Sequence, residues 1–244
     1  MRRFTLRPER LAAGRVTFDA AESRHLTRVL RLRPGDTVVA TDGAGRDYTV
    51  RLERVGEAAT GIVLAEAAGV AASPLAITLV QGVPKGDRME AIVRAATELG
   101  VARVRPALCE RTIVRLEAGR WRDRARRWQR VAREAAKQSG RAVIPEIEPP
   151  RPLAEWLDAD EPVDVGLCLW EGGGVPLQRL LAGATSPRTA VVVVGPEGGL
   201  AESEVEAGWA RGLTVVSLGP RILRSETAGP AIVAVLQSRF GDLG

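Results

Sequence analysis

Short apolar runs alternate with longer segments of helical periodicity from residue 74 to the end of the chain, and this alternation restricts the fold more than any other feature. In residues 87–99, Met89, Ile92 and Val93 begin an apolar series that recurs every three or four positions, as on one face of a helix. Strands that alternate with helices are typical of an α/β domain with a largely parallel sheet. We therefore predict such a domain over residues 74–244. Its expected strands are 75–81, 104–108, 163–169, 190–194 and 214–218, and its expected helices are 87–99, 121–139, 202–210 and 226–240.

Residues 1–70 have a different pattern, in which short strand-like segments are separated by turn residues. Asp19 and Glu22 have the spacing of a capping box, which predicts a short helix that runs through Arg31. An Asp42-Gly43 pair between two such segments predicts a β-hairpin. We therefore expect a small β-rich domain, with a linker composition at 67–74. Its expected strands are 37–41, 46–55 and 61–65.

Positive charge is concentrated in two stretches of the chain. Residues 1–35 hold nine arginines against three acidic residues, and residues 120–141 hold nine basic residues against two acidic ones. Residues 142–244, in contrast, hold seven arginines and fourteen acidic residues. A stripe on the expected helix at 121–139 is either a solvated face or a surface for a polyanion, and the basic N-terminal stretch favours nucleic acid. The stripe consists of Arg122, Arg126, Arg130, Arg133 and Lys137.

The chain has too few histidines and cysteines for the common metal sites and disulfide scaffolds. His25 is the only histidine, which excludes a multi-histidine metal centre, and Cys109 and Cys168 form no C-x-x-C motif. We expect no bound metal and no disulfide scaffold. The first residues lack the apolar core of a signal peptide, and no apolar run approaches the length of a membrane span. These observations predict a cytoplasmic protein without a membrane partner.

Loops that contain glycine follow three of the expected strands, at 169–174, 195–199 and 218–226. Ligands of open α/β sheets bind beyond the carboxyl ends of the strands, and glycine lets the backbone approach a ligand closely. Neither G-x-G-x-x-G after a strand nor a P-loop is present, which disfavours nicotinamide and nucleotide triphosphate enzymes. Backbone carbonyls combined with Glu171, Glu197 and Glu226 suit a small neutral or cationic ligand. The alternative is that these glycines serve only to make tight turns.

Four segments of the α/β region together resemble the ribosomal RNA small-subunit methyltransferase E family of the SPOUT methyltransferases. They are QGVPKGDRME at 81–90, EAAKQSGR at 134–141, VGPEGG at 194–199 and LGPRILRSETA at 218–228. HLTRVLR at 25–31 and PGD at 34–36 are similar to the PUA-like RNA-binding domain of that family. The resemblance covers nearly the whole chain in order. One departure is Ala201, where the family often has Ser or Thr, and its lack of a hydroxyl predicts a weaker cap on the next helix.

The resemblance implies both a fold and a reaction. The fold would be a C-terminal SPOUT domain over 74–244, with a parallel sheet and a deep trefoil knot, and an N-terminal PUA-like β-barrel over 1–70. The enzyme would be a homodimer that methylates N3 of a uridine in 16S ribosomal RNA, as naked RNA or in the small subunit, with S-adenosylmethionine as methyl donor. By resemblance, the cofactor-binding residues would be Leu169, Gly195, Pro196, Glu197, Gly198, Gly199, Leu218, Gly219, Ile222, Leu223 and Arg224. The RNA-binding residues would be Arg3, His25, Arg28, Arg31, Lys85 and Arg88.

Catalytic candidates follow from the chemistry of the uridine imide, which must lose its N3 proton to become a good nucleophile. Arg111 and Arg224 are candidates for stabilising the negative charge that develops on the carbonyl oxygens. Glu226 is a candidate base, or the carboxylate that orients an arginine. The alternative is that Arg224 and Glu226 form a structural pair where the last helix begins.

Two other functions remain open from the sequence. The chain could be a SPOUT methyltransferase that acts on another RNA or another base atom. It could also be a non-catalytic RNA-binding or ribosome-assembly protein with a vestigial pocket, although the intact loops at 195–199 and 218–228 argue against loss of the pocket. A DNA-binding function has less support, because no helix-turn-helix or zinc motif is present.

Overall fold

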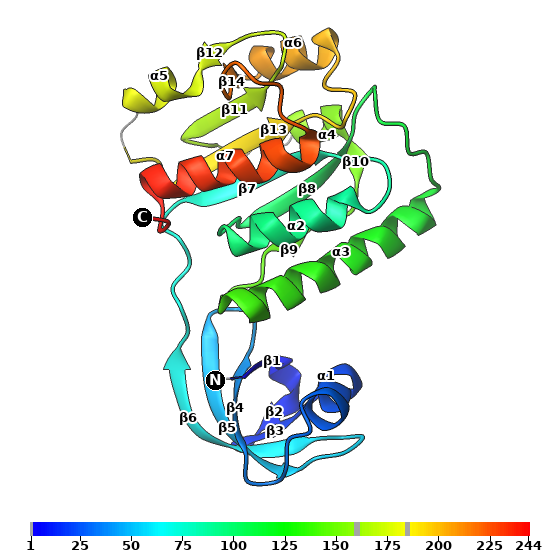
Figure 1. Cartoon of the computed structure of the whole chain (residues 1–244), viewed down its shortest axis with the longest axis vertical. Coiled ribbons are helices and arrows are strands. Elements are labelled where there is room, and N and C mark those ends of the chain that lie inside the picture. The colour runs from blue at the N-terminus through cyan, green and yellow to red at the C-terminus, as the bar shows by residue number, and fades with distance from the viewer. Residues whose placement is uncertain (1, 159–161, 184–185) are drawn as a thin grey trace. The chain divides into compact units, whose positions relative to one another are not determined.

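The computed structural model describes residues 2–158, 162–183 and 186–244 (Figure 1). The chain forms two compact units. The first contains the residues up to Ala72 together with Arg133–Ile144, and the second contains Ser73–Ala132 and Pro145–Gly244. The long helix α3 (Ala118–Ser139) therefore begins in the second unit and ends in the first.

The first unit is a six-stranded sheet in the order β1-β4-β5-β6-β3-β2. Only the pairing of β1 with β4 is parallel. Its core is a cluster of buried apolar side chains, among them Phe4, Phe18, Leu26, Val38 and Leu52. The strands are β1 (Arg3–Thr5), β2 (Leu11–Ala12), β3 (Arg15–Thr17), β4 (Thr37–Thr41), β5 (Arg46–Arg54) and β6 (Thr60–Ala68), with a 3-10 turn η1 (Pro8–Arg10), helix α1 (Ala20–Arg24) and a π-helical turn η2 (His25–Val29).

The predicted capping box forms only in part, and the helix that it opens is shorter than expected. Asp19 Oδ1 accepts a hydrogen bond from the Glu22 backbone N–H at 2.9 Å, as an N-cap should. The Glu22 carboxylate does not return to the cap, because it accepts hydrogen bonds from Thr5 at 2.6 and 3.1 Å. Helix α1 ends at Arg24, η2 follows, and Arg31 has a φ of 50°, so the expectation of one continuous helix through Arg31 was wrong.

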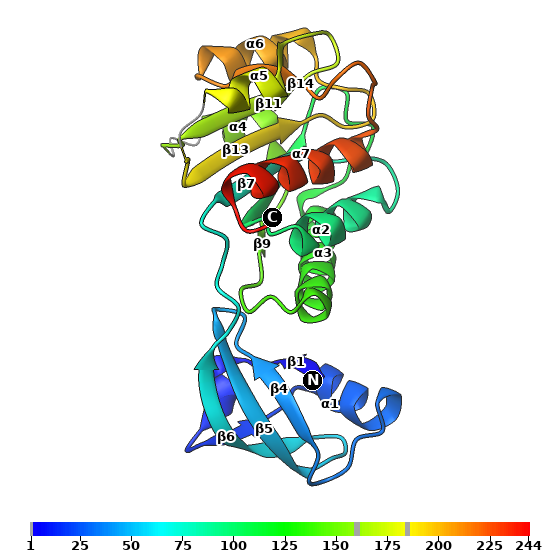
Figure 2. The same ribbon diagram turned by 60° about the vertical axis from the view of Figure 1, so that its left-hand side comes forward.

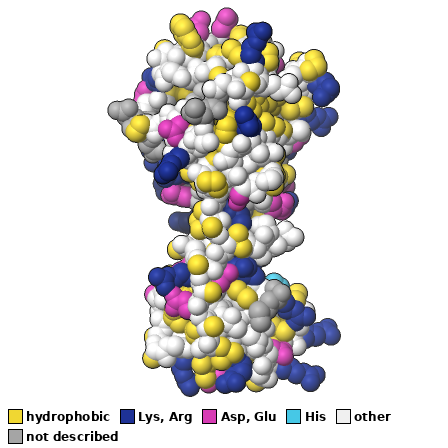
Figure 3. All heavy atoms as spheres, turned by 90° about the vertical axis from the view of Figure 1, so that its left-hand side faces the viewer, with side chains coloured by type: hydrophobic (Ala, Val, Ile, Leu, Met, Phe, Trp, Pro, Cys, Tyr) yellow, Lys and Arg dark blue, Asp and Glu magenta, His cyan; other side chains and the backbone are white. Residues whose placement is uncertain are grey.

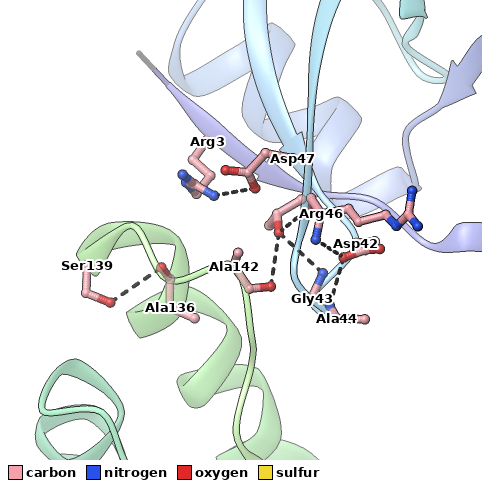
Figure 4. Close-up of polar contacts among 10 residues, drawn as sticks. Arg3, Asp42, Gly43, Ala44, Arg46, Asp47, Ala136, Ser139 and Ala142 are labelled. Atoms are coloured by element: carbon pink, nitrogen blue, oxygen red, sulfur yellow. Dashed lines mark hydrogen bonds and ion pairs between the residues drawn. The ribbon is translucent and has the colours of Figure 1, made fainter. Parts of the chain in front are cut away.

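The end of α3 and the residues after it belong to the first unit (Figure 4). The Ala142 carbonyl accepts hydrogen bonds from the Gly45 backbone N–H at 3.1 Å and from the Thr41 hydroxyl at 3.3 Å. Lys137 Nζ lies 3.0 Å from Glu22 Oε1, and both side chains are nearly inaccessible, at 7% and 5% exposure. The prediction that Lys137 continues an accessible basic stripe was therefore wrong, because its charge is already paired inside this unit.

The second unit is a parallel α/β domain, as expected (Figure 2). Its main strands follow the order β10-β8-β7-β13-β11-β14-β12, and β9 pairs with β8. All described pairings in this sheet are parallel. The strands are β7 (Ala76–Gly82), β8 (Arg103–Leu108), β9 (Glu146–Ile147), β10 (Arg151–Pro152), β11 (Val165–Leu169), β12 (Val175–Pro176), β13 (Thr189–Val194) and β14 (Thr214–Ser217). The five predicted strands begin and end within two residues of their observed bounds.

Helices cover this sheet in two packed pairs. Helix α7 (Ser225–Phe240) contacts α2 (Arg88–Glu98) and lies against β7 and β13. Helix α4 (Leu153–Leu157) contacts α6 (Glu202–Ala210) through a buried cluster that includes Trp156 and Val205. Helix α5 (Leu177–Ala182) contacts the short strand β12. None of the helices in the described part of the chain has the length and apolar character of a membrane span.

Candidate functional site

A cavity of about 670 Å³ lies in the second unit at the carboxyl ends of β11, β13 and β14. These three strands are neighbours in the sheet, so the loops that follow them meet at one edge. The walls are residues 169–171, 194–199 and 216–226, with Arg88 and Ala228. The three loops singled out in the sequence therefore contribute to a single site.

The cavity contains every residue that the family resemblance assigned to cofactor binding. The lining members of that set are Leu169, Gly195, Pro196, Glu197, Gly198, Gly199, Leu218, Gly219, Ile222, Leu223 and Arg224. Two catalytic candidates, Arg224 and Glu226, also line it. The structure thus brings these residues together, while their contacts with a ligand stay a prediction.

The loop after β13 is a tight backbone turn that leaves no room for side chains at its glycine positions. The Gly199 N–H donates to the Pro196 carbonyl at 2.9 Å, and Gly199 has a φ of 71°. A Cβ on Gly195 would lie 2.8 Å from the Leu200 nitrogen. On the opposite side of the turn, a Cβ on Gly82 would collide with the Pro196 backbone. Glycine is required here because backbone contacts backbone.

A buried polar network that sequence reasoning missed ties this turn to two other segments. Gln81 lies one residue before the end of strand β7 and is fully buried, and its Nε2 donates to the Ser225 hydroxyl at 2.9 Å and to the Gly82 carbonyl at 3.1 Å. The Ser225 hydroxyl donates to the Gly195 carbonyl at 2.7 Å. The strand β7, the turn after β13 and the start of α7 are therefore held by one set of hydrogen bonds. The available signal was a polar residue that closes an otherwise apolar strand.

Arg111 lies outside the cavity wall but contacts it. Its Nη1 donates to the Gly198 carbonyl at 3.1 Å. Arg224 is 82% exposed in its side chain, and its Nη1 lies 4.0 Å from Glu226 Oε1, at the limit of an ion pair. The helix-start pair between Arg224 and Glu226 is therefore present but loose, and both arginine candidates are accessible to a substrate.

Two residues predicted to touch RNA lie beside the same cavity. The Lys85 backbone N–H donates to the Glu197 carboxylate at 3.1 and 3.2 Å, while its side chain is exposed. Arg88 lines the cavity, with Nη1 3.9 Å from Glu197 Oε1 and Nε 3.8 Å from Glu226 Oε1. Arg88 thus faces two carboxylates of the proposed cofactor site.

The other four predicted RNA contacts belong to the first unit. Arg28 and Arg31 are exposed, whereas Arg3 pairs with Asp47 at 2.6 Å and is only 17% exposed. The His25 ring packs edge-on against a buried phenylalanine, with ring centroids 5.6 Å apart. Lys and Arg side chains gather on the visible surface of this unit (Figure 3). Arg28 and Arg31 are therefore available to RNA phosphates, while Arg3 and His25 already have partners.

Glu204 replaces the missing cap at the start of α6. Ala201 occupies the N-cap position, and its backbone N–H donates to Glu204 Oε2 at 2.9 Å. The other oxygen, Oε1, accepts from the Glu110 backbone N–H at 2.8 Å. The expected loosening of this loop is therefore offset by one carboxylate that binds both chain segments.

The two cysteines are not nucleophile candidates. Both are buried, and burial raises the pKa of the Cys168 thiol to about 12 and that of the Cys109 thiol still further. The thiols therefore stay protonated at neutral pH. In the described residues, no three His, Cys, Asp or Glu side chains come together as a metal site requires.

Two protein-family models match the chain. The model of an RNA methyltransferase domain matches residues 71–237, and that of an RNA methyltransferase PUA domain matches residues 18–59. The first match covers most of the second unit and also includes residues 133–144 of the first unit, and the second match lies within the first unit.

Similar proteins and solved structures are methyltransferases by name. Ribosomal RNA small subunit methyltransferase E of Synechocystis is 32% identical over 238 residues, which cover 97% of this chain and 77% of that protein. The Mycobacterium tuberculosis protein is 31% identical over 91% of this chain and 87% of its own. The Neisseria gonorrhoeae enzyme, solved bound to S-adenosyl methionine, superposes with a TM-score of 0.89 at 36% identity over the full length of both chains. A putative methyltransferase from Legionella pneumophila, also solved with this cofactor, gives 0.92 at 28% identity over 99% of both chains.

Proposed function

Because the chain belongs to the ribosomal RNA small subunit methyltransferase E family, we propose that it transfers a methyl group from S-adenosylmethionine to N3 of a uridine in 16S ribosomal RNA. The observation that carries this proposal is the meeting of three strand-end loops around one cavity at the sheet edge. Two structural relatives were solved with the same cofactor.

The cavity fits such a cofactor in size and in chemistry. About 670 Å³ lies within the range of small-molecule sites. The backbone of the turn after β13 lines the cavity, because Gly199 has no side chain and a Cβ there would meet the Glu171 carboxylate in the cavity wall. A Cβ on Gly198 would lie 3.2 Å from Arg111 Cβ, so a larger side chain there would displace the turn or Arg111. We assign the adenine edge to backbone groups near Leu218, Gly219 and Leu223.

The bound cofactor supplies an electrophilic methyl group, and the chain must position the uridine and accept its N3 proton. Arg111 and Arg224 would stabilise the negative charge on the uridine carbonyl oxygens, because both are exposed beside the cavity. Glu226 lies in the cavity wall and would accept the proton or orient Arg224. No second carboxylate has to be invoked for this step.

The finer properties of the family extend the proposal. We expect the first domain, over residues 1–70, to bind RNA through Arg28 and Arg31, and the second, over 74–244, to contain the trefoil knot and to form a homodimer. A ribosomal RNA substrate would place the enzyme in the cytoplasm, where small subunits assemble.

The test is mass spectrometry of nucleosides from small-subunit ribosomal RNA of cells with and without the gene. We expect 3-methyluridine to disappear on deletion and to return with the wild-type gene but not with a Gly198→Trp variant. An unchanged profile would refute the 16S assignment. Binding of S-adenosylmethionine by the purified protein would then separate a methyltransferase with another RNA target from a non-catalytic RNA-binding protein.

A further inference from the structure

Glu171 is a carboxylate in the cavity wall that neither the reaction nor the family resemblance has used. It follows Leu169 and Trp170 at the carboxyl end of β11. Its side chain lies directly over Gly199 in the turn after β13, in the space that a Cβ at that position would occupy. The absence of a side chain at residue 199 therefore lets this carboxylate reach the turn that forms the cavity floor.

The other two acidic residues of the cavity have partners in the protein. Glu197 accepts hydrogen bonds from the Lys85 backbone, and Glu226 lies 3.8 Å from the Arg88 guanidinium. Glu171 forms no hydrogen bond or ion pair with any residue that the structure describes. Glu171 is exposed to solvent, and it is the cavity carboxylate that has no ionic or hydrogen-bond partner within the described residues.

A positively charged ligand in the cavity would give the Glu171 carboxylate an ionic partner. S-adenosylmethionine has a positively charged sulfonium, whereas its product S-adenosylhomocysteine has a neutral sulfur. At a few ångströms in a partly desolvated site, the attraction between opposite charges is several times larger than in bulk water. A carboxylate near the sulfur would therefore bind the methyl donor more tightly than the product.

We propose that the Glu171 carboxylate faces the sulfonium of the bound cofactor and makes the site prefer S-adenosylmethionine to S-adenosylhomocysteine. The inference rests on the proposed function, because it assumes that this cofactor occupies the cavity. It assigns Glu171 a specificity role: the positive charge that the carboxylate holds is lost when the methyl group leaves, so the product is released more readily.

Isothermal titration calorimetry of the full chain with each of the two compounds tests the proposal. For the Glu171→Gln variant, which keeps the shape and removes the charge, we expect affinity for S-adenosylmethionine to fall by about tenfold or more, with less than a threefold change for S-adenosylhomocysteine. Glu171→Asp keeps the charge and should retain part of the preference. The matched control is Glu206→Gln, which removes an exposed charge outside the cavity wall and should change neither affinity.

The outcomes separate this inference from the proposed function. Equal weakening of both compounds by Glu171→Gln, or no change in either, would overturn the sulfonium assignment and leave the methyltransferase proposal standing. A wild-type protein that binds neither compound would overturn both. Thermal melting of each variant without ligand checks that an affinity loss does not come from unfolding.

Discussion

Removal of the Ser225 hydroxyl should destabilise the second unit more than removal of the Gln81 amide. Ser225→Ala breaks the 2.7 Å hydrogen bond to the Gly195 carbonyl and the 2.9 Å hydrogen bond from Gln81 Nε2. The Gly195 carbonyl then keeps only a long contact of 3.4 Å with that nitrogen. A buried polar group left without its partner costs about 1–3 kcal/mol, so we expect the free energy of unfolding to fall by about 2 kcal/mol.

We expect Gln81→Met to lower the free energy of unfolding less than Ser225→Ala, although it removes a larger polar group. The Ser225 hydroxyl can still donate to the Gly195 carbonyl at 2.7 Å. The substitution also removes Gln81 Oε1, a buried oxygen without a hydrogen-bond partner among the described residues. Methionine fills a similar volume, so we expect a loss of only about 1 kcal/mol or less.

Chemical and thermal denaturation measure this difference. For a chain of this size, 2 kcal/mol corresponds to a decrease in Tm of about 4–8 °C. Ser203→Ala removes a hydroxyl from an exposed serine near the start of α6, so it serves as the control and should stay within about 0.5 kcal/mol of the wild type. We also expect weaker binding of S-adenosylmethionine by Ser225→Ala, because Gly195 and Ser225 both line the cavity. The reasoning is refuted if Gln81→Met proves as destabilising as Ser225→Ala or more so.

Three further predictions concern close contacts and buried groups. Gly82→Ala should reduce both Tm and cofactor affinity, because its Cβ would collide with the Pro196 backbone and force the turn after β13 to move. Thermal melting with and without S-adenosylmethionine measures both effects. Lys137→Met should destabilise the first unit by about 3–5 kcal/mol, since it leaves the buried Glu22 carboxylate without its cation. The double variant with Glu22→Gln, which removes the charge and keeps an oxygen to accept from Thr5, should recover most of the loss in denaturation experiments. Cys109 and Cys168 should react with a thiol reagent only as fast as the protein unfolds. Because burial raises the pKa of Cys168 to about 12, its contribution to stability should be full below the pKa of the unfolded thiol and decline as the pH rises from about 9 towards 12.

The sequence identified the three loops that line the cavity because local patterns mark them. Each loop follows an apolar run that is long enough to be a buried strand, and each contains glycine. The carboxyl ends of parallel strands lie at one edge of a sheet, so the loops could be expected there before the strand order was known. The two-residue strands β9, β10 and β12 carry no such pattern, and they were missed because two residues show no periodicity.

Long-range partners could not be predicted in the same way. The pattern of α3 gave Lys137 and the arginines the same apparent role on a basic stripe, because periodicity specifies a helix face but not what contacts it. Glu22, which lies 115 residues away in the sequence, decides that Lys137 is buried. For the same reason, no local signal indicated that residues 133–144 join the first unit, whose contacts with them include the Lys137–Glu22 ion pair and hydrogen bonds to residues 41–45.

The strand order also determines which basic residues near the cavity are available to contact RNA. Because β7 is the direct neighbour of β13, the segment after β7 must lie beside the turn at 195–199. Arg88 consequently faces Glu197 and Glu226, and its charge is partly neutralised by two carboxylates before any substrate binds. Lys85 is held at the same place by its backbone alone, and its exposed ammonium group forms no ion pair within the described residues. A phosphate is attracted most strongly to a cation that has no carboxylate beside it, so Lys85 is the better candidate for contacting RNA near the cavity. Arg88 is better suited to neutralising the acidic side chains of the cavity wall.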